Sequence, residues 1–191
     1  MAALDLFNLK GRRALITGSS QGIGYGLAAG MVEAGAEVVL NGRDHVKLNE
    51  AVACLKAAGH VVHGAAFDVT DKADATRAVD MIESKIGAID ILINNAGMQF
   101  RAPLEDYPDE KFDELLRVNI KSVFLVGQAV ARHMIPRGSG KMINICSVQS
   151  ELGRPSIAPY TATKGAVKML TKGMCADWAK HGLQINAIGP G

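Results

Sequence analysis

The fold of this chain is decided by Ala-Leu-Ile-Thr-Gly-Ser-Ser-Gln-Gly-Ile-Gly, residues 14–24. An apolar run opens the stretch, glycines follow, and residues 25–34 have a helix-like pattern. A strand, a glycine turn and a helix in this order direct backbone N–H groups and a helix N-terminus at one point, which suits phosphate. The spacing is Gly-x-x-x-Gly-x-Gly and not the general Gly-x-Gly-x-x-Gly fingerprint. We favour nucleotide binding over a purely structural turn because of the flanking strand and helix.

The glycines of this turn have separate expected tasks. Gly18 and Gly22 allow the turn and a close approach of the backbone to a ligand, while Gly24 allows the helix to pack against the strand. The cofactor contacts expected here are Gly18, Ser20, Gln21, Gly22 and Ile23.

The rest of the chain repeats strand followed by helix. Its length fits a single domain over residues 1–191. Six strands alternating with five helices predict an α/β fold, a Rossmann-type doubly wound parallel sheet in three αβα layers, with strand order 3-2-1-4-5-6. The later strands are expected at 37–43, 61–67, 89–93, 141–146 and 183–188, and the later helices at 44–58, 71–86, 109–133 and 159–180.

The composition favours chemistry on small molecules. The net charge is only +2, from 21 basic and 19 acidic residues that are interspersed, so we expect neither a nucleic-acid nor a membrane partner. The N-terminus lacks a basic region and an uninterrupted apolar run. Three cysteines without Cys-x-x-Cys spacing fit a reducing cytoplasm, and His63 has no second ligand at metal spacing, so no metal is expected.

The end of the second expected strand bears on the choice of dinucleotide. It lies about twenty residues past the glycine turn, where the ribose of the adenosine half is recognised. An acidic residue there would repel a 2′-phosphate, but this chain has Asn41 and Arg43. A guanidinium can form two hydrogen bonds with a phosphate, so the sequence favours NADP over NAD. The alternative is that Arg43 merely begins a solvated helix.

Two further strand ends carry polar residues. Asp68 would accept the adenine amino group, or it only orders the next turn. In Asn-Asn-Ala-Gly, residues 94–97, side-chain amides would brace the backbone and small residues would leave room for a sugar ring; the alternative is an ordinary turn. The cofactor contacts expected at these two ends are Asp68, Val69, Asn95, Ala96 and Gly97.

The candidate reaction centre lies between the fifth strand and the last helix. Tyr160 and Lys164 are four residues apart, so they share one helix face, and Ser147 ends the preceding strand. A neutral phenol is a poor acid–base catalyst near pH 7, but a neighbouring ammonium favours the phenolate. The same Tyr-x-x-x-Lys spacing also occurs by chance in exposed pairs. Asn119 interrupts the apolar stripe of the helix at 109–133, either as a satisfied core amide or within a water chain to the lysine.

Taken together, these motifs resemble those of the short-chain dehydrogenase/reductase family, from about Leu9 to Gly191. The resemblance implies that Tyr160 exchanges a proton with the substrate oxygen and that Ser147 hydrogen-bonds this oxygen. It also implies that Lys164 favours the phenolate and binds the nicotinamide ribose, that Asn119 positions a water, and that hydride moves between the nicotinamide and the carbinol carbon. The resemblance rests on 17–24, Asp68, 94–97, Asn119, Ser147, Tyr160, Lys164 and 189–191, and it adds Pro190 and Gly191 as cofactor contacts.

Within the family, the stretches 39–43, 67–70, 143–147 and 149–155 resemble most those of members that reduce 5-ketogluconate to gluconate with NADPH. A sugar acid needs a cation for its carboxylate and polar groups for its hydroxyls. We expect Arg101 or Arg154 to meet the carboxylate; the alternative is that the polar side chains only brace their loops. The expected substrate contacts are Arg101, Ser147, Gln149, Glu151, Arg154 and Tyr160.

Two departures from the family pattern leave alternatives open. Gln21 stands where many NADP-using relatives have a basic residue, and the chain ends where relatives continue into a substrate-covering loop, a helix and a seventh strand. The alternatives are a reductase of another carbonyl, such as a 3-oxoacyl thioester, and a catalytically silent nucleotide-binding fragment. The helices at 109–133 and 159–180 resemble those of the family's dimer interface, which implies a homodimer or homotetramer.

Overall fold

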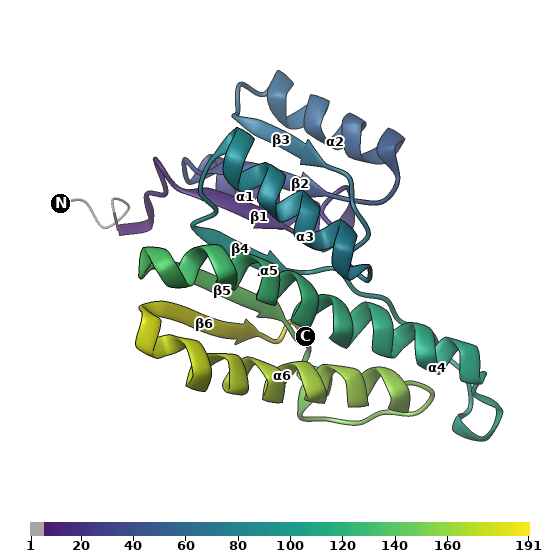
Figure 1. Ribbon diagram of the computed structural model, residues 1–191. Helices are drawn as coiled ribbons and strands as arrows, with labels where there is room; N and C mark the ends of the chain where they lie inside the picture. The colour runs from purple at the N-terminus through teal and green to yellow at the C-terminus, as the bar shows by residue number, and fades with distance from the viewer. Residues whose placement is uncertain (1–5) are drawn as a thin grey trace.

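A computed structural model describes residues 6–191 of the chain. The first five residues of the N-terminus, which the sequence analysis describes as lacking a basic region and an apolar run, lie outside this range. Within it, six parallel strands form one sheet in the order β3-β2-β1-β4-β5-β6, so the predicted strand order is confirmed (Figure 1). The strands are β1 (Arg13–Ile16), β2 (Glu37–Asn41), β3 (Val62–Ala65), β4 (Ile91–Asn94), β5 (Gly140–Ile145) and β6 (Leu183–Ile188).

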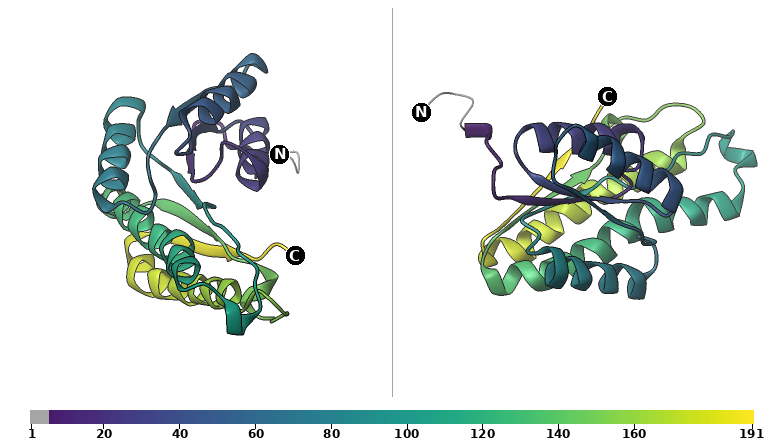
Figure 2. Two further views of the ribbon diagram at one scale, coloured as in Figure 1. Left: turned by 90° about the vertical axis from the view of Figure 1, so that its right-hand side faces the viewer. Right: turned by 90° about the horizontal axis from the view of Figure 1, so that it is seen from above.

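Helices cover both faces of the sheet and form the outer layers (Figure 2). The helices α1 and α2 contribute to one apolar core, whereas α3, α5 and α6 contribute to the other. The α-helices are α1 (Gly22–Glu33), α2 (His45–Ala57), α3 (Lys72–Met81), α4 (Asp109–Leu115), α5 (Ser122–Arg137) and α6 (Ala158–Trp178).

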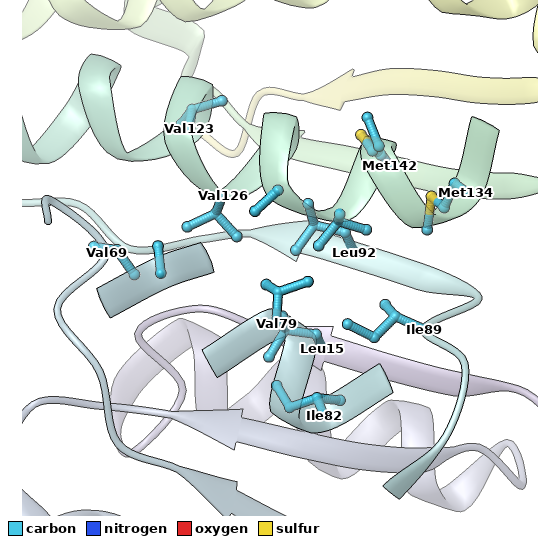
Figure 3. Close-up of a cluster of buried hydrophobic side chains, with 14 of the residues drawn as sticks. Leu15, Val69, Val79, Ile82, Ile89, Leu92, Val123, Val126, Met134 and Met142 are labelled. Atoms are coloured by element: carbon cyan, nitrogen blue, oxygen red, sulfur yellow. The ribbon is translucent and has the colours of Figure 1, made fainter. Parts of the chain in front are cut away.

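Alternation along the central strands divides the side chains between the two cores. Ala14 and Ile16 of β1 enter the core with α1 and α2, and Leu15 between them enters the opposite core. Figure 3 shows Leu15 beside Val79 of α3, with Val126 of α5 in the same cluster. Burial on both faces explains why these strands have near-continuous apolar sequences.

The predicted long helix at 109–133 has a more complex form. It consists of α4, a π-helical turn η4 (Leu116–Lys121) and α5, which continues to Arg137. The predicted end is wrong because Met134 is buried in the core and Gly138, with φ of 67°, provides the left-handed residue that ends the helix. Several strands are also shorter than predicted, since β2 ends at Asn41, β3 at Ala65, and β4 begins only at Ile91.

Because all the strands are parallel, their carboxyl ends meet at one edge of the sheet. Asn94 at the end of β4 is in register with Asn144 of β5, and Ile145 of β5 is in register with Ile188 of β6. The glycine turn after β1 and Ser147 after β5 therefore lie at the same edge, where open α/β sheets bind their ligands. Within residues 6–191, no helix combines the length and apolarity needed to cross a membrane.

A charged cluster lies at the opposite end of the sheet. Glu37 at the start of β2 accepts hydrogen bonds from Arg13 Nη2 at 2.6 Å and is 2.7 Å from His63 Nε2. Burial by itself would raise the pKa of Glu37, but the bonds with Arg13 and His63 hold the pKa below its usual value. This carboxylate therefore stabilises the fold at pH values above the pKa of the unfolded chain, and the contribution is lost as pH falls through the folded pKa.

Glu37→Gln is accordingly expected to lower the free energy of unfolding at pH 7 by about 1–3 kcal/mol, because a charged partner of Arg13 is lost. Urea unfolding measured from pH 7 down to pH 3 should also show a weaker acid dependence than in the parent protein. Glu50→Gln, at an exposed position of α2, is the control and should change neither quantity. Equal behaviour of both variants would contradict the assignment.

Candidate active site

A cleft of about 1020 Å³ runs along the carboxyl edge of the sheet. Its walls come from the glycine turn, the ends of β2, β4 and β5, and the first turns of α6. Every residue that the sequence predicts as a cofactor contact lines this cleft, and so does Ser147. The structure thus brings together motifs that are far apart in the chain, and their contact with a cofactor remains a proposal.

The glycine turn is shaped by close backbone packing. Gly18 has φ of 59°, and a Cβ added to it would lie 2.9 Å from Ala96 Cα. A Cβ on Gly24 would lie 2.4 Å from the Gly18 carbonyl oxygen. Helix α1 then begins with no acidic residue in its first turn and no side-chain cap from Gln21, so its N-terminal amides face the cleft without a protein anion. This cradle suits a phosphate group.

The loop after β4 is fastened to the glycine turn, as the sequence anticipates for its amide side chains. Asn95 Nδ2 donates to the carbonyl oxygens of Thr17 and Gly18, each at 3.0 Å. In return, Thr17 Oγ1 accepts hydrogen bonds from the backbone N–H groups of Asn95 and Ala96, also at 3.0 Å. These bonds hold the small residues after β4 against the floor of the cleft.

Asn41 lines the cleft, but its side chain acts as a brace. Oδ1 accepts from Gly18 N at 3.1 Å, and Nδ2 donates to the carbonyl oxygens of Ala65 at 3.2 Å and Phe67 at 3.0 Å. The residue is 2% exposed, and both amide donors are used. The side chain of Asn41 therefore holds three strand ends in place, and the expected contact of Asn41 with a cofactor stays a prediction.

Charged side chains line the cleft beyond the ends of β2 and β3. Arg43 extends with 70% of its side chain exposed, and its Nη1 lies 3.8 Å from Asp68 Oδ2. Burial would raise the pKa of Asp68, but hydrogen bonds from Thr70 and the charges of Arg43 and Arg117 hold it below its usual value. Asp68 is therefore a ready acceptor at neutral pH.

Lys47 in the first turn of α2 also lines this end of the cleft, and the sequence interpretation missed it. Its ammonium is 3.9 Å from Asp44, the residue that caps α2 through bonds to the N–H groups of Val46 and Lys47. The sequence feature that could have identified Lys47 is its position four residues after Arg43, on the other side of the helix cap Asp44. Arg43 and Lys47 thus both line the cleft that Gln21 also lines.

Tyr160 and Lys164 face the cleft from α6, as their spacing predicts. Lys164 is 6% exposed, its Nζ donates to the Ile145 carbonyl oxygen at 2.7 Å, and it lies 5.8 Å from the centre of the Tyr160 ring. Burial lowers the pKa of Lys164, although the nearby Cys146 has the opposite effect. Ser147 Oγ accepts from Gln149 N at 3.2 Å, which leaves its own proton available to a ligand.

Asn119 lies behind the cleft within the π-helical turn η4. Its Oδ1 accepts from Met98 N at 2.8 Å, and its Nδ2 donates to the Met98 carbonyl oxygen and to Thr163 Oγ1, each at 3.0 Å. The side chain is thus a fully bonded amide, and the expected part of Asn119 in a water chain to Lys164 stays a prediction. The side chain joins the loop after β4 to α6 one residue before Lys164.

Of the expected substrate residues, Ser147 and Tyr160 line the cleft, whereas Arg101, Gln149, Glu151 and Arg154 lie on two segments beside it. The segments meet where Ala102 N donates to the Ser156 carbonyl oxygen at 3.2 Å. Glu151 forms an ion pair with Lys168 of α6, whereas Gln149 Oε1 is buried and has no partner among the described residues. Glu151 is thus already engaged, and Gln149 has an unpaired acceptor that is buried and does not line the cleft.

The fold and the cleft define a dinucleotide-dependent oxidoreductase of the Rossmann type. A model of the short chain dehydrogenase family matches residues 12–191, so the chain belongs to this family.

Particular relatives are similar over the whole chain. Gluconate 5-dehydrogenase of Gluconobacter oxydans is 60% identical over 191 residues, which are 100% of this chain and 75% of the relative. The 5-keto-D-gluconate 5-reductase of Escherichia coli K12 is 50% identical over 187 residues, covering 98% and 74%. A crystal structure of a gluconate 5-dehydrogenase from Burkholderia cenocepacia in complex with NADP and tartrate has a TM-score of 0.96 and 58% identity, covering 99% and 74%. These similarities confirm the predicted family and its CH–OH oxidoreductase class.

Proposed function

We propose that this protein interconverts 5-keto-D-gluconate and D-gluconate with NADP(H). The observation that carries the proposal is the convergence of Ser147, Tyr160 and Lys164 on the same cleft as the glycine turn. The named activities of the relatives from Gluconobacter oxydans and Escherichia coli support this substrate. The solved relative, which binds NADP and tartrate, supports both a phosphorylated dinucleotide and a hydroxylated carboxylate.

The residues of the cleft fit NADP(H). The open N-terminus of α1 and the turn that the close packing at Gly18 and Gly24 shapes suit the pyrophosphate, and Arg43 and Lys47 provide positive charge for the 2′-phosphate. Bound there, the cofactor would supply or accept the hydride.

The side chains of α6 and β5 supply the proton chemistry. During reduction of the ketone, Tyr160 Oη delivers a proton to the carbonyl oxygen, which Ser147 Oγ holds by a hydrogen bond. The Lys164 ammonium, fixed by the Ile145 carbonyl oxygen, favours the phenolate that remains. Asn119 supports the site by fixing Met98 around it.

Recognition of the sugar acid falls to the two outer loops. Arg101 and Arg154 are exposed, and neither forms an ion pair with another described residue. One guanidinium is therefore free for the carboxylate. Gln149 would bind a hydroxyl only after its buried amide oxygen turns toward the substrate.

The decisive assay follows NADPH oxidation at 340 nm with 5-ketogluconate. We expect turnover with this substrate, and the reverse reaction with gluconate and NADP. A 3-oxoacyl thioester serves as the competing substrate. Turnover of the thioester without turnover of 5-ketogluconate would contradict the proposed substrate, and NADPH binding without any turnover would favour a silent nucleotide-binding fragment.

The double variant Arg101→Ala/Arg154→Ala should raise the KM for 5-ketogluconate at least about tenfold, because a charge-assisted hydrogen bond contributes about 1.5–3 kcal/mol. The turnover number at saturation should change much less. Arg132→Ala, at a distant position of α5, is the matched control. An unchanged KM in the double variant would remove both arginines from substrate recognition.

Arg43→Asp tests the cofactor. The change places a carboxylate beside the expected 2′-phosphate, so the dissociation constant for NADPH should rise about 10–100-fold, as expected for loss of a charged contact. NADH should be affected far less, because it lacks this phosphate. Fluorescence titration with both dinucleotides gives the ratio, and equal losses would exclude Arg43 from phosphate binding.

A homodimer or homotetramer and a cytoplasmic location remain predictions. The exposed Phe124 of α5 and Met169 of α6 are 43% and 60% accessible and lie on the two helices concerned. Sedimentation analysis of the purified protein would measure the oligomeric state directly.

A further inference from the structure

We propose that Ser150 is a positioning residue, whose single hydroxyl sets the separation between Ser147 and Lys164. This inference rests on the proposed function, since it gives Ser150 a task within the same reaction centre. Ser150 does not line the cleft. Its effect on the reaction therefore has to pass through its two neighbours.

The hydroxyl of Ser150 both accepts and donates a hydrogen bond. Its Oγ accepts a hydrogen bond from Ser147 N at 3.3 Å and donates one to the Lys164 carbonyl oxygen at 3.0 Å. Ser150 ends the short 3₁₀ turn η5 (Val148–Ser150), and Ser147 Oγ in turn accepts from Gln149 N. The end of β5 is thus joined to the middle of α6 through one side chain.

A second link joins the same two elements, but it uses the Lys164 ammonium itself, which donates to the Ile145 carbonyl oxygen. This ammonium has to serve the reaction as well. The Ser150 bridge holds Lys164 by its backbone, so it involves neither the charged group nor the reacting oxygen atoms. The bridge can keep Ser147 and α6 at a fixed separation while the position of Lys164 Nζ adjusts to a ligand.

The neighbouring contact is of a different kind. Glu151 pairs with Lys168, which lies four residues after Lys164, but 62% of the Glu151 side chain is exposed. Exposed ion pairs contribute little, because water and salt screen them. Ser150 is partly buried, and its loss would leave the Ser147 N–H without this acceptor. The hydroxyl, and not the ion pair, is therefore the effective bridge.

The test is a double-mutant cycle on the full chain with NADPH and 5-ketogluconate. We expect Ser150→Ala to lower the turnover number about tenfold, since small misplacements of reacting groups are costly. In a Ser147→Ala background, the same change should lower turnover less than about twofold, because the group that Ser150 positions is gone. Lys168→Met is the control and should keep parental turnover. An equal loss in both backgrounds, or no loss at all, would overturn the proposal.

Two further readouts separate positioning from a loss of stability and from failure of the proposed substrate. The NADPH dissociation constant of Ser150→Ala should stay within about twofold of the parent value. Hydrogen exchange of residues 145–151 should be faster in Ser150→Ala and unchanged in Lys168→Met, whether or not 5-ketogluconate is turned over. Absence of parental turnover would then contradict the proposed function alone, whereas unchanged exchange would overturn the role of Ser150.

Discussion

Tyr160→Phe is expected to lower the turnover of 5-ketogluconate by about 10²–10⁴-fold, the range typical for removal of a general acid. The change deletes only the phenolic oxygen and keeps the ring that lines the cleft. NADPH should therefore bind with nearly the parental dissociation constant. A loss of turnover without a loss of binding separates proton transfer from cofactor recognition.

The chain offers a matched control at Tyr107. Its hydroxyl is buried and has no partner among the described residues, and burial raises its pKa. Tyr107→Phe should keep parental turnover and should be neutral or slightly stabilising, because an unpaired polar atom is removed. Steady-state kinetics and NADPH titration on both variants complete the comparison. If Tyr160→Phe kept more than a tenth of the parental turnover, another group would have to donate the proton.

Gly24→Ala is expected to have the second large effect, on cofactor binding and on the fold together. The new Cβ would lie 2.4 Å from the Gly18 carbonyl oxygen and 2.5 Å from Asn95 Nδ2. Real Cβ atoms do not come so close, so the turn or the loop after β4 has to shift. Overpacking of this kind costs about 1–3 kcal/mol. The dissociation constant for NADPH should rise at least about tenfold, because the displaced turn forms the phosphate cradle.

Gly30→Ala in the same helix is the control for this substitution. A Cβ there meets nothing within 4 Å, so the change should stabilise α1 by about 0.5–1 kcal/mol and leave NADPH binding unchanged. Thermal unfolding and fluorescence titration measure both quantities. Equal behaviour of the two alanine variants would show that Gly24 is replaceable and that the cradle does not depend on it.

Much of the fold could be predicted from local sequence patterns. Apolar runs, the glycine turn and caps such as Asp44 are set by residues close together in the chain, so they predict the elements and the αβ alternation. The residues at which the helices and strands end could be predicted less well. The end of α5 at Arg137 depends on Met134 reaching a core built by other segments, and β2 ends at Asn41 because this side chain bonds to neighbouring strand ends.

By itself, the sequence determined the family, the parallel strand order and the convergence of Ser147, Tyr160 and Lys164, because each follows from motif spacing and from the common edge of parallel strands. Only the tertiary structure decided which polar groups remain free for a ligand. Asn41 is committed to Gly18, which is 23 residues away, and a similar separation joins Asn119 to Met98. A hydrogen bond depends on distance and direction in space, and for segments so far apart in the chain these are set by the packed sheet and its helices.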